Sequence, residues 1–389
     1  MSVISSIPTT PKLTIISHSY WATENQKNLA YLSNEFEVQA VVPKWYIVNG
    51  KKTLGKRASV GGEFVRWVDA VGIGRGSFLF APFGNLIAKQ DPDVVNIEYA
   101  PWSPVTVQSA AIVSLRAPHA KLVLSVKKNT YRDSSLTREC IKKTLRFIVD
   151  KKVSGYIAAS RRVADLYSNK LYVDPLRIFV CHHLGVDLDL FHPGTPPNYL
   201  SDSGAVIGYC GQFEARKGVP ELVESIQALT NSVDHNVSLR LLGDGSMREM
   251  LVRNAKSLPW LSVEGPVQHA EVADFLRGCD IFAFPSRIEE DHEEHDGHAL
   301  MEAMATGLPV VTTMSGIIPE LVNDKCAFIV PERNPIALAS AIGNLIGNPK
   351  ARLLMGEQSR RLAEAEFGLA QVASRRAGII KEILYGRQT

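Results

Sequence analysis

The stretch of residues 279–313 constrains the possible fold of this chain more than any other. It begins with an apolar run at 281–284, ended by a Pro-Ser pair, which is typical of a buried parallel strand. A polar, acidic loop follows, and Gly297 then begins a helix whose repeat of alanine, leucine and methionine gives it one apolar face. A Gly-Leu-Pro sequence ends this helix at 307–309, and the next strand is expected at 310–313. Strand, helix and parallel strand in this order form a βαβ unit, whose ligands bind beyond the carboxyl ends of the strands.

The residues around the start of this helix suit an anion or a ring of hydroxyl groups. The backbone amides of Gly297, His298 and Ala299 lie at the positive end of the helix. Glu294 precedes the helix, and Glu302 lies within it, eight residues later. A carboxylate accepts two neighbouring hydroxyl hydrogen bonds, so these residues suit the diol of a ribose or of a sugar. On spacing alone, favourable interaction with the helix dipole explains a glutamate at this place equally well.

The pattern Glu, seven residues, Glu-Ala-Met-Ala, any residue, Gly, any residue, Pro-Val-Val resembles the donor-site signature of the family 4 retaining glycosyltransferases. The resemblance implies an α/β protein of the GT-B fold, in which two Rossmann-like domains with parallel sheets face across a cleft. It implies an acceptor-side domain at residues 1–195 and a sugar-nucleotide domain at 196–365. Residues 366–389 would form a C-terminal helix that packs back on the first domain.

Length and composition agree with two such domains. A chain of 389 residues can bury two cores, and 45% hydrophobic with 21% charged residues is typical of a soluble globular protein. The sequence has no apolar run of the length that spans a bilayer and no secretion-signal pattern at its start. Five scattered cysteines indicate free thiols in a reducing compartment, and a net charge of +3 gives no sign of nucleic-acid binding. We therefore expect a cytoplasmic protein, with possible peripheral contact at the inner face of the membrane.

The first half alternates strands with helices, which favours a parallel sheet. Strands are expected at 13–17, 36–42, 93–97, 121–125, 155–159 and 173–180, with helices at 19–33 and 104–115 and a loop from Pro43 onward. His18 and Lys127 each follow an expected strand, so they could face an acceptor, although such residues are also common as surface groups. Many family members have a Gly-Gly pair and a histidine at these two places, and this sequence departs from both.

In the second half, a strand at 205–209 leads into a glycine-containing turn that ends in a basic pair. Arg216 and Lys217 stand just before a helix expected at 220–229, where they can place positive charge against a diphosphate. The spacing from the glycine to Lys217 resembles the family pattern, while Gln212 occupies a position where many relatives have arginine. Val267 matches the turn that holds the nucleotide base in the family.

The resemblance implies a role for each of these residues. Lys217 and Arg216 would stabilise the leaving diphosphate, Glu294 would orient the sugar, and Glu302 would bind the ribose. Asp296, next to Gly297, could serve instead of Glu294. The expected donor-binding residues are Gln212, Val267, Asp296, Gly297, His298, Ala299, Leu300 and Glu302.

The loop at 289–296 is rich in carboxylates and imidazoles, which can coordinate a divalent ion. GT-B enzymes generally work without a metal, so we interpret it as a mobile, solvated loop on the donor side. We expect no metal and no cofactor other than the sugar-nucleotide substrate.

Lysine and arginine dominate residues 127–162, which has two interpretations. The basic side chains could form a solvated helix face. Alternatively, they could meet anionic headgroups while Leu136, Ile141, Leu145 and Ile148 pack inward or touch lipid.

The sequence thus indicates transfer of a sugar from a nucleotide-diphosphate sugar, with a UDP-sugar favoured, to a carbohydrate or lipid-linked acceptor hydroxyl. Polysaccharide or glycolipid assembly is the expected setting. The alternatives are an epimerase or phosphorylase on the same fold and a non-catalytic subunit that binds a sugar nucleotide.

Overall fold

The computed structural model describes residues 10–48, 51–72, 78–127, 136–194, 204–232, 237–290 and 292–386. The chain forms two units, Met1–Gly185 with Val372–Thr389, and Val186–Gln371. It passes from the first unit to the second between Gly185 and Val186. The domain boundary expected at 195/196 lies outside the described residues. The boundary expected at 365/366 falls one residue before the end of a helix at Glu366, and the second unit extends to Gln371.

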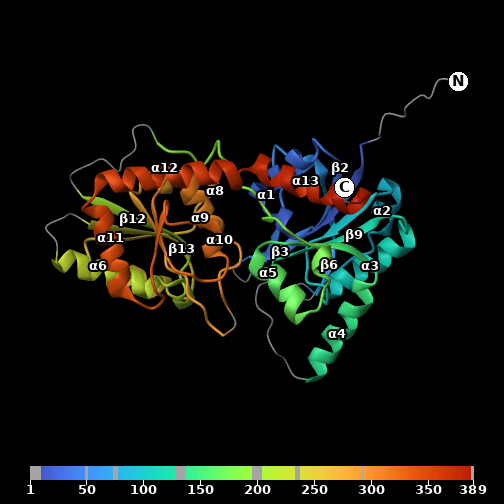
Figure 1. Ribbon diagram of the computed structural model, residues 1–389, viewed down its shortest axis with the longest axis horizontal. Coiled ribbons are helices and arrows are strands. Elements are labelled where there is room, and N and C mark those ends of the chain that lie inside the picture. The colour runs from blue at the N-terminus through green and yellow to red at the C-terminus, as the bar shows by residue number, and fades with distance from the viewer. Residues whose placement is uncertain are drawn as a thin grey trace. The chain divides into compact units, whose positions relative to one another are not determined.

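The first unit, most of which is coloured blue to green in Figure 1, is built on a parallel sheet. The strand order of this sheet is β11-β10-β9-β8-β1-β2-β5. Its strands are β1 (Lys12–Ile16), β2 (Glu37–Pro43), β5 (Val65–Val68), β8 (Val94–Ile97), β9 (Lys121–Val126), β10 (Val153–Ala158) and β11 (Ile178–Val180). Its helices are α1 (Thr23–Leu32), α2 (Gly84–Gln90), α3 (Pro104–Arg116), α4 (Leu136–Asp150) and α5 (Arg161–Asp165). Short helical turns are η1 (Ser19–Trp21), η2 (Gly62–Phe64), η3 (Leu166–Lys170) and η4 (Pro175–Arg177). Two small antiparallel sheets pair β3 (Trp45–Val48) with β4 (Lys51–Leu54) and β6 (Ala70–Val71) with β7 (Leu79–Phe80).

Helix α13 (Leu369–Tyr385) returns the chain to the first unit and covers one face of this sheet. Its residues Ala373, Ala377 and Ile380 are buried with Leu13 and Ile15 of β1 in one hydrophobic cluster. Helices α2 and α3 supply side chains to a second cluster on the opposite face. The expected return of the C-terminal helix to the first domain is therefore confirmed.

Two expectations for the first unit are wrong in detail. The segment from Pro43 is not a loop, because β2 extends through Pro43 and the antiparallel pair of β3 and β4 follows at once. The strand expected at 173–180 begins only at Ile178. Asp174 caps the turn η4 by accepting a hydrogen bond from the backbone of Leu176, and the proline that follows Asp174 fixes the start of that turn.

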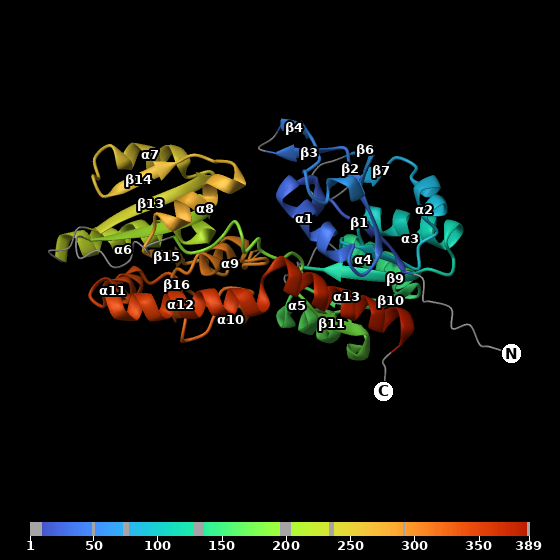
Figure 2. The same ribbon diagram turned by 90° about the horizontal axis from the view of Figure 1, so that it is seen from above.

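The second unit contains a parallel sheet with the strand order β14-β13-β12-β15-β16-β17. Figure 2 shows strands of this sheet side by side from β14 to β16. Its strands are β12 (Ala205–Gln212), β13 (Val237–Asp244), β14 (Leu261–Glu264), β15 (Ile281–Phe284), β16 (Val310–Thr312) and β17 (Ala327–Ile329). Its helices are η6 (Ala215–Lys217), α6 (Val219–Ser232), α7 (Arg248–Ala255), α8 (His269–Arg277), α9 (His298–Ala305), α10 (Ile318–Leu321), α11 (Pro335–Ile346) and α12 (Pro349–Glu366).

The sequence of strand β15 is apolar throughout because both faces of the strand are buried. Ile281 and Ala283 belong to the core cluster that α6 and α11 complete, whereas Phe282 and Phe284 belong to the cluster with α8 and α9. Figure 1 shows α8 and α9 on one side of the sheet and α6 and α11 on the other. A strand buried on both faces has no polar position, and its carboxyl end is where polar residues begin.

No helix within the described ranges is long and apolar enough to cross a membrane.

Candidate functional site

Helix α9 begins directly after Gly297, whose φ of 60° is in the left-handed region that favours glycine. A side chain there would also collide, because a Cβ on Gly297 would lie 2.3 Å from Cδ1 of Leu321. The helix buries its apolar face, including Leu300 and Met304. The first turn has no N-cap side chain, so its backbone amides, among them that of His298, form the positive end of the helix.

Lys217 forms a buried ion pair with Glu294. Gly218, which follows Lys217, approaches the end of β15 so closely that a Cβ on it would lie 2.0 Å from the carbonyl oxygen of Pro285. This contact holds Lys217 beside the loop after β15, and its Nζ lies 2.8 Å from Oε2 of Glu294. Ser286 donates a hydrogen bond to the same oxygen at 2.9 Å. The Lys217 and Glu294 side chains are only 13% and 8% exposed.

Glu294 is ionised and fixed in position. Burial by itself raises the pKa of this carboxyl, but the charge of Lys217 and hydrogen bonds from Lys217 and Ser286 outweigh it, so the pKa is lowered. The backbone N–H of Glu294 donates to Oγ of Ser315 at 3.2 Å, and its carbonyl oxygen accepts from the N–H of Ile317 at 3.0 Å. The carboxylate is therefore in place before a ligand arrives.

The expectation of a solvated acidic loop is wrong for residues 292–294, whereas Glu290 and Asp296 of the same loop are exposed. His292, Glu293 and Glu294 are 7%, 2% and 6% exposed, and Asp291 lies outside the described residues. The ion pair with Lys217 allows Glu294 to be buried, because a carboxylate without a partner would have to stay in water. Within the described residues, no group of three or more His, Cys, Asp or Glu side chains could hold a metal ion.

Arg216 is held by three neighbours and is about one third exposed. Its guanidinium donates to Glu214, to Oε1 of Gln212 at 3.1 Å and to Nδ1 of His292. Gln212 therefore accepts a hydrogen bond from Arg216. The positive charge at this turn comes from the consecutive residues Arg216 and Lys217.

Glu302 lies against two imidazoles. Its Oε1 is 2.7 Å from Nε2 of His269 and 3.7 Å from Nε2 of His298, and its side chain is buried. The sequence prediction missed His269, which begins α8. The signal that could have found it is its position, because it starts the helix directly after the connection that contains Val267.

Glu294 and Glu302 each raise the pKa of a residue in the carboxyl-terminal part of β12. Burial, then Glu294, raises the pKa of Tyr209, and burial, then Glu302, raises the pKa of Cys210 to about 12. Tyr209 and Cys210 are consecutive residues of that strand. The carboxylates that flank the start of α9 therefore lie at the same end of the sheet, where a βαβ unit binds its ligand.

Three other residues that were expected on the donor side are exposed or half-buried. Val267 is exposed in the connection between β14 and α8. Asp296 is exposed before α9, and Ala299 is half-buried in its first turn. The structure thus pairs Lys217 with Glu294, Arg216 with Gln212, and His298 with Glu302.

In the first unit, His18 and Lys127 follow β1 and β9, which β8 separates in the sheet. The His18 ring stacks on Tyr46 of β3, with centroids 5.4 Å apart and an interplanar angle of 12°. It also lies 5.2 Å from the ring of Tyr99. The sequence prediction missed both tyrosines, although the run of aromatic and β-branched residues from Trp45 is itself a strand signal.

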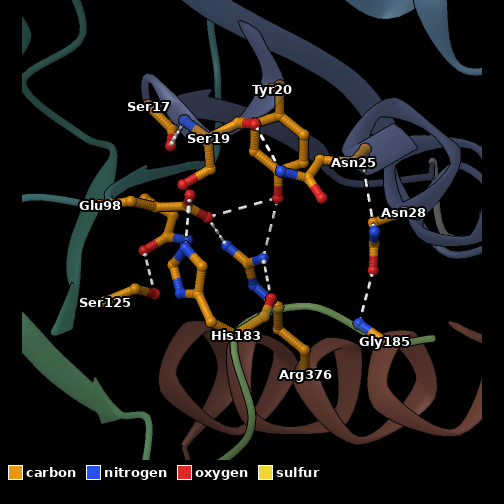
Figure 3. A network of polar contacts seen from close by, with 11 residues as sticks. Ser17, Ser19, Tyr20, Asn25, Asn28, Glu98, Ser125, His183, Gly185 and Arg376 are labelled. Carbon is orange, nitrogen blue, oxygen red and sulfur yellow. Dashed lines mark hydrogen bonds and ion pairs between the residues drawn. The ribbon is translucent and has the colours of Figure 1, made fainter. Parts of the chain in front are cut away.

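A buried polar network lies at the carboxyl end of β8 (Figure 3). Glu98 accepts hydrogen bonds from Arg376 of α13 and from Nε2 of His183 at 2.8 Å. The hydroxyl of Tyr20 lies 3.4 Å from the Glu98 carboxylate and accepts from Arg376 at 3.0 Å. Glu98, His183 and Arg376 have side chains that are at most 8% exposed. This network ties α13 and the segment before Gly185 to the first unit.

Comparison with known proteins finds a family whose pattern matches part of the second unit. Residues 204–348 match the family described as Glycosyl transferases group 1. The capsular polysaccharide biosynthesis glycosyltransferase CapM of Staphylococcus aureus is 30% identical over 177 residues, which are 43% of this chain and 43% of CapM. A D-inositol 3-phosphate glycosyltransferase of Xylanimonas cellulosilytica is 29% identical over 211 residues, 49% of this chain and 48% of that protein. The chain spans about half the length of these curated relatives.

Solved structures are similar over nearly the whole chain. A glycosyltransferase from Rickettsia africae has a TM-score of 0.72 at 16% identity, covering 97% of this chain and 100% of that one. HepE of Anabaena, solved in complex with UDP, has a TM-score of 0.69 at 16% identity, covering 95% and 100%. At such low identity these likenesses concern the fold.

Two parallel α/β sheets and a C-terminal helix that returns to the first unit define a protein of the GT-B class. The predicted fold class is confirmed. Residues 204–348 match the group 1 family of glycosyltransferases, also called family 4, and this match includes the motif that begins at Glu294.

Proposed function

We propose that this protein moves a sugar from a nucleotide-diphosphate sugar to an acceptor hydroxyl and retains the anomeric configuration. The observation that carries the proposal is the buried ion pair of Lys217 and Glu294 beside the amino end of α9. Both residues lie within the part of the chain that matches the family. Relatives are named for capsular polysaccharide and inositol phosphate, which supports a carbohydrate or lipid-linked acceptor in polysaccharide or glycolipid assembly.

The basic turn and the helix amides serve the leaving group in this proposal. The bond from the anomeric carbon to the phosphate oxygen breaks, a bond to the acceptor oxygen forms, and the proton of the acceptor hydroxyl passes to the departing diphosphate. Negative charge grows on the diphosphate as it leaves. Lys217, Arg216 and the amides of His298 and Ala299 then stabilise the transition state more than the ground state.

The two glutamates serve the sugar and the nucleotide. Glu294 is ionised and fixed, so it can accept hydrogen bonds from neighbouring sugar hydroxyls. Lys217 bridges this carboxylate and the diphosphate, which keeps opposite charges alternating through the site. The imidazoles of His269 and His298 contact Oε1 of Glu302, and we place the ribose hydroxyls on Oε2.

We expect a UDP-sugar to be the donor. HepE structures contain UDP and UDP-glucose, whereas one relative is named as GDP-mannose-dependent. Calorimetry should show UDP-glucose binding about tenfold or more tightly than GDP-mannose or ADP-glucose, since loss of one hydrogen bond to the base costs about 1 kcal/mol or more, and about 1.4 kcal/mol is tenfold in affinity. A preference for GDP-mannose would replace the UDP assignment. Failure of all three to bind would overturn the proposed function.

Incubation separates the proposed reaction from its alternatives. UDP-glucose is incubated with and without a panel of oligosaccharide acceptors, and products are followed by NMR. Transfer requires an acceptor and leaves an anomeric signal that reports retention. An epimerase changes the sugar without an acceptor, a phosphorylase needs inorganic phosphate, and a binding subunit releases no UDP.

We also propose that α4 contacts the anionic surface of the cytoplasmic leaflet. Its apolar side chains Ile141, Phe147 and Ile148 are 55%, 60% and 53% exposed, so they do not pack inward. Lys143 is exposed on the same helix, and Nζ of Lys151 lies 4.3 Å above the Phe147 ring. We call these five residues the α4 patch. Apolar side chains flanked by lysines suit an anionic lipid surface, and Figure 1 shows α4 extending away from the sheet of its unit.

Removing the apolar part of the α4 patch should release the protein from vesicles. In flotation, the wild type is expected to bind phosphatidylcholine vesicles only when phosphatidylglycerol is added. Phe147→Ser with Ile148→Ser should bind about tenfold or more weakly, because burial of these side chains supplies the attraction. Ile336→Ser is the matched control, since Ile336 is 81% exposed in the other unit. Equal binding by both variants, or none by the wild type, would rule out this contact.

A further inference from the structure

One histidine beside the basic turn has no role in the proposal so far. His292 lies between β15 and α9, and its side chain is buried. The backbone groups of Glu289 and His292 hydrogen-bond each other, with the Glu289 N–H 2.7 Å from the His292 oxygen. The ring therefore sits on a closed turn, two residues before Glu294.

The contact with Arg216 fixes the tautomer of this ring. A guanidinium has only donors, so Nδ1 of His292 must accept the hydrogen bond from Arg216. The proton of the neutral ring is then on Nε2. Burial, followed by the charges of Lys217 and Arg216, lowers the pKa of His292 to about 4. At neutral pH the ring therefore presents a neutral Nε2–H donor.

That donor has no hydrogen-bond partner among the residues that the structure describes. Nε2 of His292 is fully buried, and so is Nδ1 of the neighbouring His295, which also lacks a partner there. The two rings have centroids 5.5 Å apart. A buried N–H without an acceptor is unfavourable and is rarely kept in a folded protein without a reason. A ligand oxygen would supply the acceptor.

We propose that His292 binds the nucleotide sugar directly, donating its Nε2–H to an oxygen of the diphosphate or of the transferred sugar. This inference rests on the proposed function, because it places the ligand beside Lys217 and Glu294. An imidazolium could not take this role, since its Nδ1–H would face the guanidinium of Arg216. His292 thus adds a neutral donor beside the cations Lys217 and Arg216.

The test compares two side chains that donate from this position, histidine and glutamine, with phenylalanine, which does not. Calorimetry with UDP and UDP-glucose, and with GDP and GDP-mannose, is run on the wild type, His292→Phe and His292→Gln. The glutamine amide places an N–H near the position of Nε2, whereas phenylalanine keeps the ring without a donor. We expect His292→Phe to bind about tenfold more weakly and His292→Gln to recover most of the affinity.

The ligands that His292→Phe binds more weakly show which ligand oxygen accepts the hydrogen bond from His292. Weaker binding of both UDP and UDP-glucose assigns the bond to the diphosphate, and weaker binding of UDP-glucose alone assigns it to the sugar. Wild-type affinity of His292→Phe for both ligands overturns the inference and leaves the proposed function standing. Should the wild type bind none of the four ligands, the proposed function itself fails.

Two controls separate ligand contact from folding. His119→Phe changes an exposed histidine of the other unit and should leave binding unchanged. If His292→Phe does not fold, His292→Asn replaces it, because the shorter amide reaches only the Nδ1 position. The affinity gap between the glutamine and asparagine variants then carries the test, and equal affinities would overturn the inference.

Discussion

Lys217→Ala is expected to lower kcat by roughly 100- to 1000-fold, the usual loss when one donor to a developing negative charge is removed. Lys217 is the buried cation of the proposed donor site, and its partner Glu294 is held ionised by it. The measurement is the rate of UDP release from UDP-glucose in the presence of acceptor. Lys256→Ala, which alters an exposed lysine of the same unit, is the matched control.

A second variant separates catalysis from folding. Without Lys217, the carboxylate of Glu294 stays buried beside Ser286 but loses the cation that it pairs with, which costs about 3–5 kcal/mol of stability. Lys217→Ala combined with Glu294→Gln removes that charge and should recover much of the stability without recovering activity. If the double variant turns over at the wild-type rate, Lys217 does not stabilise the leaving group.

The βαβ unit at 279–313 was predictable because burial and backbone conformation determine the residue types within each of its elements. Ile281 and Phe282 point to opposite faces of a sheet buried on both sides, so the strand is apolar throughout. Gly297 marks the start of α9 since a side chain there would meet Leu321. Such signals lie within a few residues of the element they define, and they identified both the fold class and the family.

The surroundings of the site were not predictable in the same way. The acidic loop appeared solvated because its own residues are polar, yet Lys217, which allows its burial, is 77 positions away from Glu294. His269 reaches Glu302 across 33 positions. Partners that folding brings together from distant segments leave no periodic pattern in the sequence.

Arg376→Ala is expected to destabilise the first unit by about 3–5 kcal/mol, because it leaves the Glu98 carboxylate buried with one of its cationic partners removed. Tryptophan fluorescence during urea unfolding reports this unit, since Trp21, Trp45, Trp67 and Trp102 are four of the five tryptophans. Lys381→Ala is the matched control on the same helix. Lys381 and Glu35 form an exposed ion pair, so its loss should cost less than about 1 kcal/mol.

The network around Glu98 also predicts how the stability of the first unit depends on pH. Burial by itself raises the pKa of Glu98, but His183 and Arg376, with hydrogen bonds from His183 and Ser17, outweigh it and hold the pKa well below the ordinary value. A carboxyl with a lowered pKa stabilises the fold fully above its unfolded value of about 4.3, and this contribution is lost as the pH falls further. The wild type should therefore lose stability as the pH falls from about 5, and Glu98→Gln should show a shallower loss over that range. Equal slopes for the two proteins, together with equal effects of Arg376→Ala and Lys381→Ala, would show that the network does not hold α13 on the first unit.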